Sequence, residues 1–334
     1  MKKFVNDVDD ILKEALDGFG RAHGDLVAVN HEPTFVTRAE PTKKGKVALI
    51  SGGGSGHEPL HAGFVGEGML DAACPGTVFT SPTPDQMVAA AEAVENGGGV
   101  LFIVKNYEGD VMNFEMAAEM VSCDHATVLT NDDCAVEDST YTTGRRGVAG
   151  TVVVEKMVGA LAEEGGDLGA CQALGQRVNA ATRSMGVALT SCTVPAAGTP
   201  TFQIGDDEIE MGVGIHGESG RKRIKMKSAD DITAEMINAI TTDLGGESGE
   251  VLLLVNGFGA TPTMELYLVF EAAAKQLEGK GFTIARSLVG NLCTSLDMAG
   301  CSLTVTRLDD QLKAYWDASV HTAGLRWAAG TRQH

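Results

Sequence analysis

The stretch Lys46-Val-Ala-Leu-Ile-Ser-Gly-Gly-Gly-Ser-Gly-His57-Glu58-Pro59-Leu60-His61 decides the fold of this chain. The run 46–50, with its branched apolar side chains, predicts a buried strand, and Pro59 predicts the first turn of a helix, where proline is well tolerated. Residues 51–56 would then form the turn between strand and helix. Their glycines suit a backbone that folds sharply or approaches a ligand closely. The pattern therefore indicates an α/β protein with His57 at the polar, ligand-binding mouth of a helix.

The glycine-rich segment matches none of three common motifs. A Rossmann fingerprint needs glycine where this chain has His57 or Pro59, a P-loop needs a following Gly-Lys-Ser/Thr, and a nucleophile elbow on Ser55 needs glycine at position 57. Residues 57–61 do fit H-E-x-x-H, the helical zinc motif of metalloproteases. Pro59 would break such a helix, so we expect His57 in the loop and no metal, and a zinc hydrolase stays an outside alternative.

Length and charge limit the class of protein. The chain has 334 residues, enough for two domains, and its 45 acidic and 26 basic residues give a formal net charge of -19. This balance argues against nucleic-acid and membrane-surface binding, and we expect the one basic run, 221–227, to be a solvated loop face. Seven scattered cysteines without C-x-x-C, the lack of a signal-peptide core and the lack of a membrane-length apolar stretch predict a soluble cytoplasmic protein.

Apolar periodicity, with glycine and proline as breakers, predicts strands alternating with helices. Two α/β domains are expected, each with a mostly parallel or mixed sheet flanked by helices, and we place the boundary near Arg183, giving domains 1–183 and 184–334. The expected helices are 8–20, 86–95, 111–121, 152–164, 168–182, 309–316 and one starting at Pro262. The expected further strands are 100–104, 127–130, 186–190, 251–255, 282–288 and 302–306.

Polar residues after the strand 100–104 are site candidates. Ligands collect at the carboxyl ends of strands in open α/β sheets, so the loop with Lys105 and Asp110 is expected to face one crevice with the glycine segment. Two simpler interpretations remain open. Asp110 could be a helix N-cap, and Lys105 could be a solvated charge.

A second histidine is framed by glycines in the later half of the chain. Glycines at 212, 214, 217 and 220 clear space around His216, which leaves a site residue and a buried core residue as alternatives. Arg145 and Arg146 could hold a phosphate, or they could dock their loop on acidic neighbours.

Several motifs, taken together, resemble the substrate-binding subunit of dihydroxyacetone kinase. Several motifs in one order are more specific than any one alone, and the resemblance runs from the first residues to about Trp327. The motifs are Gly52-Gly-Gly-Ser-Gly-His-Glu-Pro59, Thr80-Ser-Pro-Thr-Pro84, Lys105-Asn-Tyr-Glu-Gly-Asp110, Gly144-Arg-Arg-Gly147, Cys192-Thr-Val-Pro-Ala-Ala-Gly198, Gly212-Val-Gly-Ile-His-Gly-Glu218, Asn256-Gly-Phe-Gly-Ala-Thr-Pro262, Cys293-Thr-Ser-Leu-Asp-Met298 and Trp316-Asp-Ala318.

The resemblance implies a role for each matched residue. The histidine matched by His216 binds the ketone carbonyl carbon covalently as a hemiaminal, which would exclude glycerol because glycerol has no carbonyl. Asp110 matches the general base for the substrate hydroxyl, with His57 as its hydrogen-bonding partner. The positions that would line the substrate pocket are Gly54, Ser55, Gly56 and Lys105.

The resemblance also implies a homodimer that depends on partner proteins. Fused members continue into a nucleotide-binding domain, whereas this chain stops at His334 and has no Walker-type loop or aspartate cluster for paired magnesium ions. We therefore expect no cofactor on this chain. The phosphoryl group that gives dihydroxyacetone phosphate would come from a separate subunit, carrying either ADP recharged by a phosphoenolpyruvate phosphotransferase-system protein or ATP with magnesium. A ketone-sensing coactivator without transfer activity and a kinase subunit for a ketotetrose such as erythrulose are the alternatives.

Overall fold

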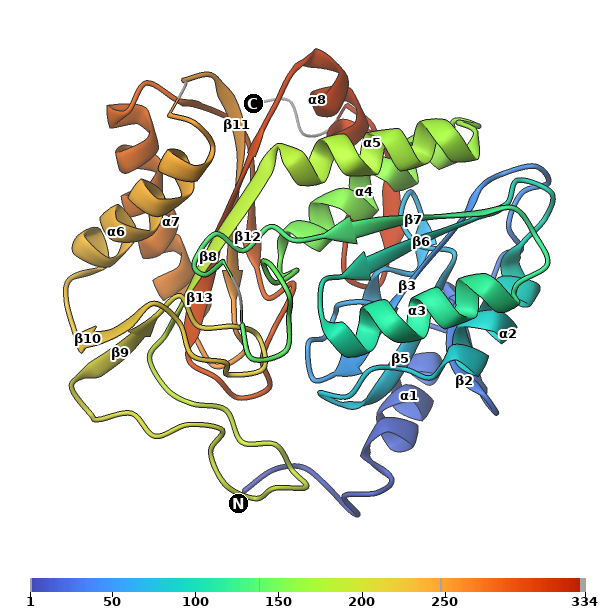
Figure 1. The fold of residues 1–334 in the computed structure, drawn as a ribbon, viewed down its shortest axis with the longest axis horizontal. Helices are drawn as coiled ribbons and strands as arrows, with labels where there is room; N and C mark the ends of the chain where they lie inside the picture. The colour runs from blue at the N-terminus through green and yellow to red at the C-terminus, as the bar shows by residue number, and fades with distance from the viewer. Residues whose placement is uncertain (1, 138, 247, 331–334) are drawn as a thin grey trace.

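The computed structural model, which describes residues 2–137, 139–246 and 248–330, contains two six-stranded sheets flanked by helices (Figure 1). The predicted fold class, α/β with parallel or mixed sheets, is confirmed. In the first sheet, β5, β3, β6 and β7 run parallel, and the pairs β1–β2 and β2–β5 are antiparallel. Its strands, in spatial order, are β1 (Val27–His31), β2 (Thr34–Arg38), β5 (Ala72–Val78), β3 (Ala48–Ser55), β6 (Val100–Lys105) and β7 (His125–Thr130).

The second sheet is mixed. Only its last two strands are parallel to each other, and all its other pairs are antiparallel. Its strands, in spatial order, are β10 (Lys222–Lys225), β9 (Glu208–Met211), β8 (Thr182–Ala188), β13 (Gly300–Arg307), β11 (Glu250–Gly257) and β12 (Thr283–Gly290).

Helices cover both sheets, and most lie within a few residues of their predicted positions. One apolar core packs α2 (Pro84–Val94) and α3 (Glu108–Met120) on the first sheet, and a second packs α6 (Ala229–Asp243) and α7 (Thr263–Gly279) on the second sheet. The largest core lies between the two sheets and includes residues of both. It also contains side chains of α4 (Gly150–Glu163), α5 (Leu168–Ala180), α8 (Asp310–Asp317) and α1 (Ile11–Ala22).

A small three-stranded sheet joins the end of the chain to its first half. It consists of β15 (Arg326–Trp327), β14 (Val320–Thr322) and β4 (Gly66–Glu67). Because β14 pairs with β4, the segment after α8 lies against the first half of the molecule. The domain boundary near residue 183 stays a prediction.

The glycine-rich segment departs from its prediction. Strand β3 continues through the glycines to Ser55, and the residues after it form turns and the 3-10 helix η1 (Ala62–Phe64) instead of an α-helix. The reason is close backbone packing. A Cβ on Gly52 would lie 2.6 Å from the carbonyl oxygen of Cys74, so the glycines let β3 continue against a crowded neighbouring strand. His57 therefore lies after a strand end and not at a helix mouth.

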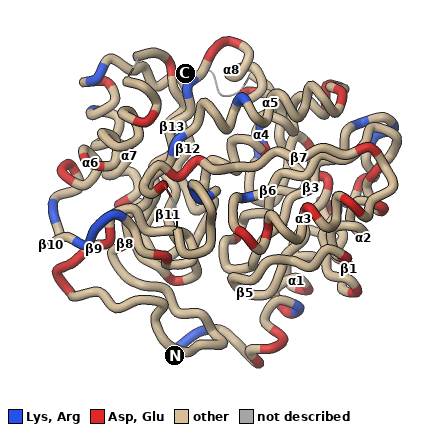
Figure 2. Tube along the Cα trace, in the orientation of Figure 1, with Lys and Arg blue, Asp and Glu red and all other residues tan. Residues whose placement is uncertain are grey.

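Figure 2 shows acidic and basic residues distributed along the whole fold, and residues of the basic run 221–227 pair with acidic neighbours. Lys225 pairs with Asp207 at 2.7 Å, and Lys222 pairs with Glu235 at 2.8 Å. These exposed pairs support the interpretation of the run as a solvated face. No helix in the described part of the chain has the length and hydropathy needed to cross a bilayer.

Candidate active site

The carboxyl ends of β3 and β6 bring the glycine segment and Lys105 together, as expected. The Lys105 ammonium donates to the carbonyl oxygen of Gly52 at 3.1 Å and lies 3.4 Å from Asp110 Oδ2. Lys105 is buried, so its interpretation as a solvated charge is wrong. A Cβ at Gly53 would lie 2.2 Å from Lys105 Nζ, so the ammonium can occupy this position only because residue 53 is glycine.

Asp110 lies in the first turn of α3, and its carboxyl group is buried. The N-cap of that helix is Tyr107, so the interpretation of Asp110 as the cap is wrong. While Oδ2 faces Lys105, Oδ1 has no hydrogen-bond partner within residues 2–137, 139–246 and 248–330. A buried carboxylate oxygen without a partner is available to accept a hydrogen bond from a ligand.

His216 is held by a carboxylate two residues away. Its Nδ1 lies 2.9 Å from Glu218 Oε1, and its backbone N–H donates to Glu218 Oε2 at 2.9 Å. Burial alone would raise the pKa of Glu218, but His216 and Arg146 outweigh burial and lower that pKa to about 2. Glu218 is therefore ionised and accepts a hydrogen bond from His216 Nδ1–H. This bond fixes the ring and directs Nε2 away from Glu218. The Gly-x-His-Gly-Glu spacing was the available sequence signal for this pair.

His57 faces His216 from the first half of the molecule. Its Nδ1 lies 2.7 Å from the carbonyl oxygen of Thr294, and its Nε2 lies 3.1 Å from His216 Nε2. Burial, and then the charges of His216 and Lys105, hold the pKa of His57 well below its usual value, so the ring is neutral. Its single proton is on Nδ1, because a carbonyl can only accept. A hydrogen bond between the two Nε2 atoms therefore requires a proton on His216 Nε2 in addition to the one that Nδ1 shares with Glu218.

The two ring nitrogens of His57 are thus used by His216 and Thr294. The expected hydrogen bond from His57 to Asp110 is not formed in this structure. The structure instead brings the site residues together as two pairs, His57 with His216 and Lys105 with Asp110. The charge of Lys105 lowers the pKa of His57, so the two pairs interact electrostatically.

Two aromatic residues that the sequence did not single out enclose the histidine pair. Phe79 stacks on His57 with ring centroids 4.9 Å apart and meets the edge of His216 at 5.1 Å. Tyr107 meets His216 at 4.7 Å, and its buried hydroxyl has no hydrogen-bond partner in the described part of the chain. Phe79 also has a φ of +56°, a conformation that non-glycine residues rarely adopt and that tends to occur at functional sites. A lone aromatic residue carries no sequence signal for such a role.

The other expected pocket residues lie along the end of β3. The Ser55 hydroxyl donates to the carbonyl oxygen of Gly76 at 2.7 Å. The Gly56 N–H donates to both oxygens of the Glu58 carboxylate at 3.0 Å. Gly54, Ser55 and Gly56 line a cavity of about 470 Å³ whose other wall includes residues of α1. His216, Lys105 and Asp110 are not among its lining residues.

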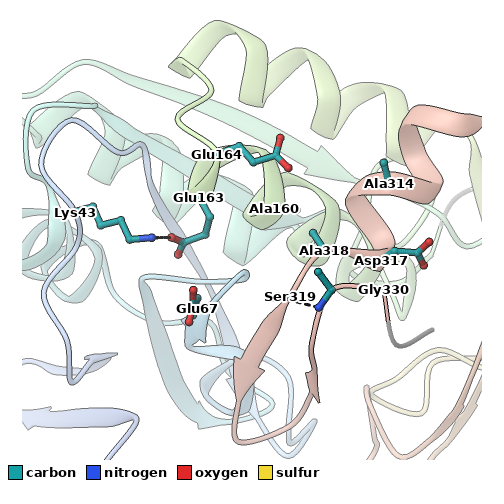
Figure 3. A pocket seen from close by; sticks show the side chains of 11 residues that line it. Lys43, Glu67, Ala160, Glu163, Glu164, Ala314, Asp317, Ala318, Ser319 and Gly330 are labelled. Atoms are coloured by element: carbon teal, nitrogen blue, oxygen red, sulfur yellow. Dashed lines mark hydrogen bonds and ion pairs between the residues drawn. The ribbon is translucent and has the colours of Figure 1, made fainter. Parts of the chain in front are cut away.

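A separate polar pocket of about 500 Å³ lies between α4 and the segment after α8 (Figure 3). In it, Lys43 points to Glu163, with Nζ 2.9 Å from Oε2, and Glu67, Glu164 and Asp317 supply further carboxylates. None of the predicted site residues lines this pocket.

Arg145 and Arg146 dock their loop on acidic residues. Arg146 Nε donates to Asp133 Oδ2 at 2.8 Å, and Arg145 is paired with Asp243 through both terminal nitrogens. Arg146 also donates to the carbonyl oxygen of Gly212 at 2.7 Å, so it anchors the loop that carries His216. The docking interpretation is confirmed.

The H-E-x-x-H residues do not form a metal site here. The first histidine, His57, faces His216. The second, His61, has different partners, with Nδ1 2.6 Å from Glu155 and Nε2 2.9 Å from Lys105. Within the residues that the structure describes, no group of three or more His, Cys, Asp or Glu side chains is placed to hold a metal ion.

Comparison with known proteins gives matches over nearly the whole chain. Residues 17–324 match the Dak1 domain family model. The chain is 48% identical to the "PEP-dependent dihydroxyacetone kinase, dihydroxyacetone-binding subunit" of Escherichia coli (strain K12), with 98% of this chain and 99% of that protein covered.

Solved structures agree with these matches. The fold resembles the dihydroxyacetone kinase of C. freundii in complex with AMP-PNP and Mg2+, with a TM-score of 0.90, 33% identity, and coverage of 97% of this chain and 61% of the other. It also resembles a dihydroxyacetone kinase operon co-activator, with a TM-score of 0.87, 32% identity, and coverage of 94% of this chain and 97% of the other. From residue 17 to residue 324, this chain belongs to the Dak1 domain family.

Proposed function

We propose that this chain is the dihydroxyacetone-binding subunit of a dihydroxyacetone kinase. It binds the ketone covalently on His216 and presents a hydroxyl group to Asp110 for phosphoryl transfer from a nucleotide-carrying partner. The observation that carries the proposal is the arrangement of His216, whose Nδ1 is held at 2.9 Å by Glu218 while its Nε2 faces a neutral histidine 3.1 Å away. The 48% identity over nearly the full length of a protein with that name supports dihydroxyacetone as the substrate of this chain.

The histidine pair can make the covalent bond without gaining or losing a proton. The Nε2 proton of His216 first moves to Nε2 of His57, which frees the lone pair on His216. That lone pair bonds to the carbonyl carbon, and the carbonyl π electrons move onto the oxygen. His57 then gives the proton to this oxygen, forming the hemiaminal hydroxyl. Because burial keeps the pKa of His57 low, His57 returns the proton readily.

Glu218 stabilises the product of this step. The His216 ring, protonated on both nitrogens before the step, is also positively charged after it, because Nε2 is then bonded to carbon and Nδ1 keeps its proton. The carboxylate at Nδ1 is buried and ionised, so it balances that charge at hydrogen-bond distance. Only a carbonyl can accept the nitrogen lone pair, so a polyol such as glycerol cannot be held in this way.

Asp110 is placed for the transfer step. Its unpaired Oδ1 accepts the proton of the substrate hydroxyl as the hydroxyl oxygen bonds to phosphorus and the donor's P–O bond breaks. Lys105, at 3.4 Å, balances the charge of the carboxylate before the proton arrives.

The phosphoryl donor belongs to partner proteins in this proposal. A nucleotide-binding subunit would carry ADP or ATP with magnesium, and the name of the E. coli relative favours recharging by a phosphoenolpyruvate-dependent protein. We also propose a cytoplasmic homodimer with the domain boundary near residue 183. The purified chain should therefore bind the ketone but show no turnover with ATP and magnesium.

A second candidate is a ketone sensor, which the similarity to a co-activator structure favours. Sensing requires only the covalent site. The buried Lys105–Asp110 pair, with one free carboxylate oxygen, favours the enzyme because a sensor needs no base. A related ketotetrose such as erythrulose would use the same chemistry.

Carbon NMR with dihydroxyacetone labelled at its carbonyl tests the proposed function. With the wild-type chain the signal should move from the carbonyl to the tetrahedral region, and with His216→Ala it should stay at the carbonyl position. A wild-type complex that keeps the carbonyl signal would refute the covalent site.

A further inference from the structure

A line of buried polar groups leads from Asp110 away from the histidine pair. Lys105 links Asp110 Oδ2, at 3.4 Å, to His61 Nε2, at 2.9 Å. His61 Nδ1 in turn lies 2.6 Å from Oε1 of Glu155 on α4. All four residues are buried, and Glu155 has no part in the steps proposed above.

The proton positions in this line follow from its acceptors. Three acceptors surround the Lys105 nitrogen, namely Asp110 Oδ2, the carbonyl oxygen of Gly52 and His61 Nε2, so an ammonium group has a partner for each N–H. His61 must then accept at Nε2. Burial, and then the charge of Lys105, hold the pKa of His61 well below its usual value, so the ring is neutral and its single proton lies on Nδ1, facing Glu155.

Glu155 would be an uncompensated charge if it were ionised. The charges of Lys105 and Asp110 balance each other, and His61 is neutral. Glu155 Oε2 has no hydrogen-bond partner in the described part of the chain, and the neighbouring Ser51 hydroxyl already donates to the carbonyl oxygen of Ile103 at 2.6 Å. Burial, opposed by Lys105 and Ser51, raises the pKa of Glu155 to about 8. The group is therefore largely protonated at pH 7.

We propose that Glu155 is a positioning residue that acts in its protonated form: its carbonyl oxygen fixes the tautomer of His61, so that Lys105 keeps its proton and its charge for Asp110. This inference rests on the proposed function, because it assigns Asp110 the role of base. It also gives the second histidine of the H-E-x-x-H sequence a function that involves no metal.

The groups around Glu155 come from several elements. Ser51 on β3 and His61 in the turn after β3 contact or adjoin the carboxyl group, Lys105 on β6 lies beyond His61, and the buried thiol of Cys293 lies near enough to interact electrostatically. On α4 itself, Lys156 donates to the carbonyl oxygen of Tyr315 and so points elsewhere. Lys105 is therefore the only one of these groups whose charge favours ionisation of Glu155 against the effect of burial. Above pH 8, two carboxylates would share that charge.

Two substitutions separate the protonated from the ionised form of Glu155. Glu155→Gln keeps a carbonyl acceptor without a charge, whereas Glu155→Ala removes the acceptor. In phosphoryl transfer reconstituted with the nucleotide-carrying and donor subunits, Glu155→Ala should lower kcat by about 10- to 100-fold, as loss of an orienting partner usually does. Glu155→Gln should lower kcat less than about threefold at pH 7, and it should move the alkaline limb of the kcat profile, expected near pH 8 in the wild type, to higher pH.

Infrared spectroscopy supplies a readout that does not depend on activity. The wild type at pH 7 should show a protonated-carboxyl band that is absent from Glu155→Gln and fades as the pH rises through about 8. Glu163→Gln, at the end of the same helix, is the matched control and should leave that band in place. The inference is overturned if Glu155→Gln loses as much activity as Glu155→Ala, if the alkaline limb does not move, or if the band is missing from the wild type.

Failure of this inference can be distinguished from failure of the proposed function. The carbon NMR signal of the adduct depends on His216 and not on Glu155. If the wild type forms no adduct, the proposed function fails. If the wild type forms the adduct and transfers phosphate while the Glu155 variants behave alike, only the inference about Glu155 fails.

Discussion

Replacing Glu218 by glutamine should weaken ketone binding strongly, because it removes the charge that balances the His216 adduct. The pKa of Glu218 lies at about 2 although burial opposes ionisation, so its favourable contacts outweigh burial. The fall from the ordinary value of 4.5 corresponds to about 3 kcal/mol at 1.36 kcal/mol per pH unit, shared among His216, Arg146 and a backbone amide. A hydrogen bond to a charged group contributes about 1.5–3 kcal/mol, so we expect the dissociation constant of the adduct to rise about 10- to 100-fold.

The assay is a titration with carbonyl-labelled dihydroxyacetone, in which the tetrahedral signal reports the bound fraction. Glu210→Gln is the matched control, since Glu210 accepts from Gly220 N at 3.0 Å at the end of the same loop and pairs with Arg223 at 3.2 Å. The control should change the dissociation constant by no more than about threefold. Binding by Glu218→Gln within that range, or equal weakening by both variants, would refute the charge-balance reasoning.

Three further predictions test other parts of the structure. Asp110→Asn should keep the tetrahedral NMR signal of the His216 adduct but lower phosphoryl transfer in the reconstituted system by about 10²- to 10⁴-fold, and a variant with normal turnover would exclude Asp110 as the base. Gly53→Ala would place a Cβ 2.2 Å from Lys105 Nζ, so the ammonium must move, and kcat should fall about 100-fold in the same assay; an unchanged kcat would contradict the packing argument. Burial lowers the pKa of Lys156 from 10.5 to about 7, so between these values the unfolded chain binds a proton that the folded chain lacks, and stability rises with pH. In denaturant titrations at about pH 7.5 and 9.5, the free energy of unfolding should rise less with pH for Lys156→Met than for the wild type. An identical rise in both proteins would contradict this prediction.

The regular elements were predictable because their apolar runs are long and clearly bounded. The strand predicted at 100–104 is β6 (Val100–Lys105), and the run 251–255 lies within β11 (Glu250–Gly257). The segment after residue 50 was not predictable in the same way. A run of glycines signals either a turn or a crowded strand, and only the approach of the neighbouring Cys74 backbone decides between them.

The site was predictable only where motifs carry it. His57, His216, Lys105 and Asp110 stand in quoted motifs, but their pairing does not follow from the sequence. The hydrogen bond from His57 to Thr294 joins residues 237 positions apart, and the one between His57 and His216 joins residues 159 positions apart. Such long-range contacts depend on how the two sheets pack, and no local pattern encodes that packing.

The most direct test of the central claim is a crystal structure of this chain soaked in dihydroxyacetone. We expect continuous electron density from His216 Nε2 to the carbonyl carbon, with a substrate hydroxyl about 2.6–3.2 Å from Asp110 Oδ1. A ketone bound elsewhere, or lying beside His216 without a bond and out of reach of Asp110, would contradict the account.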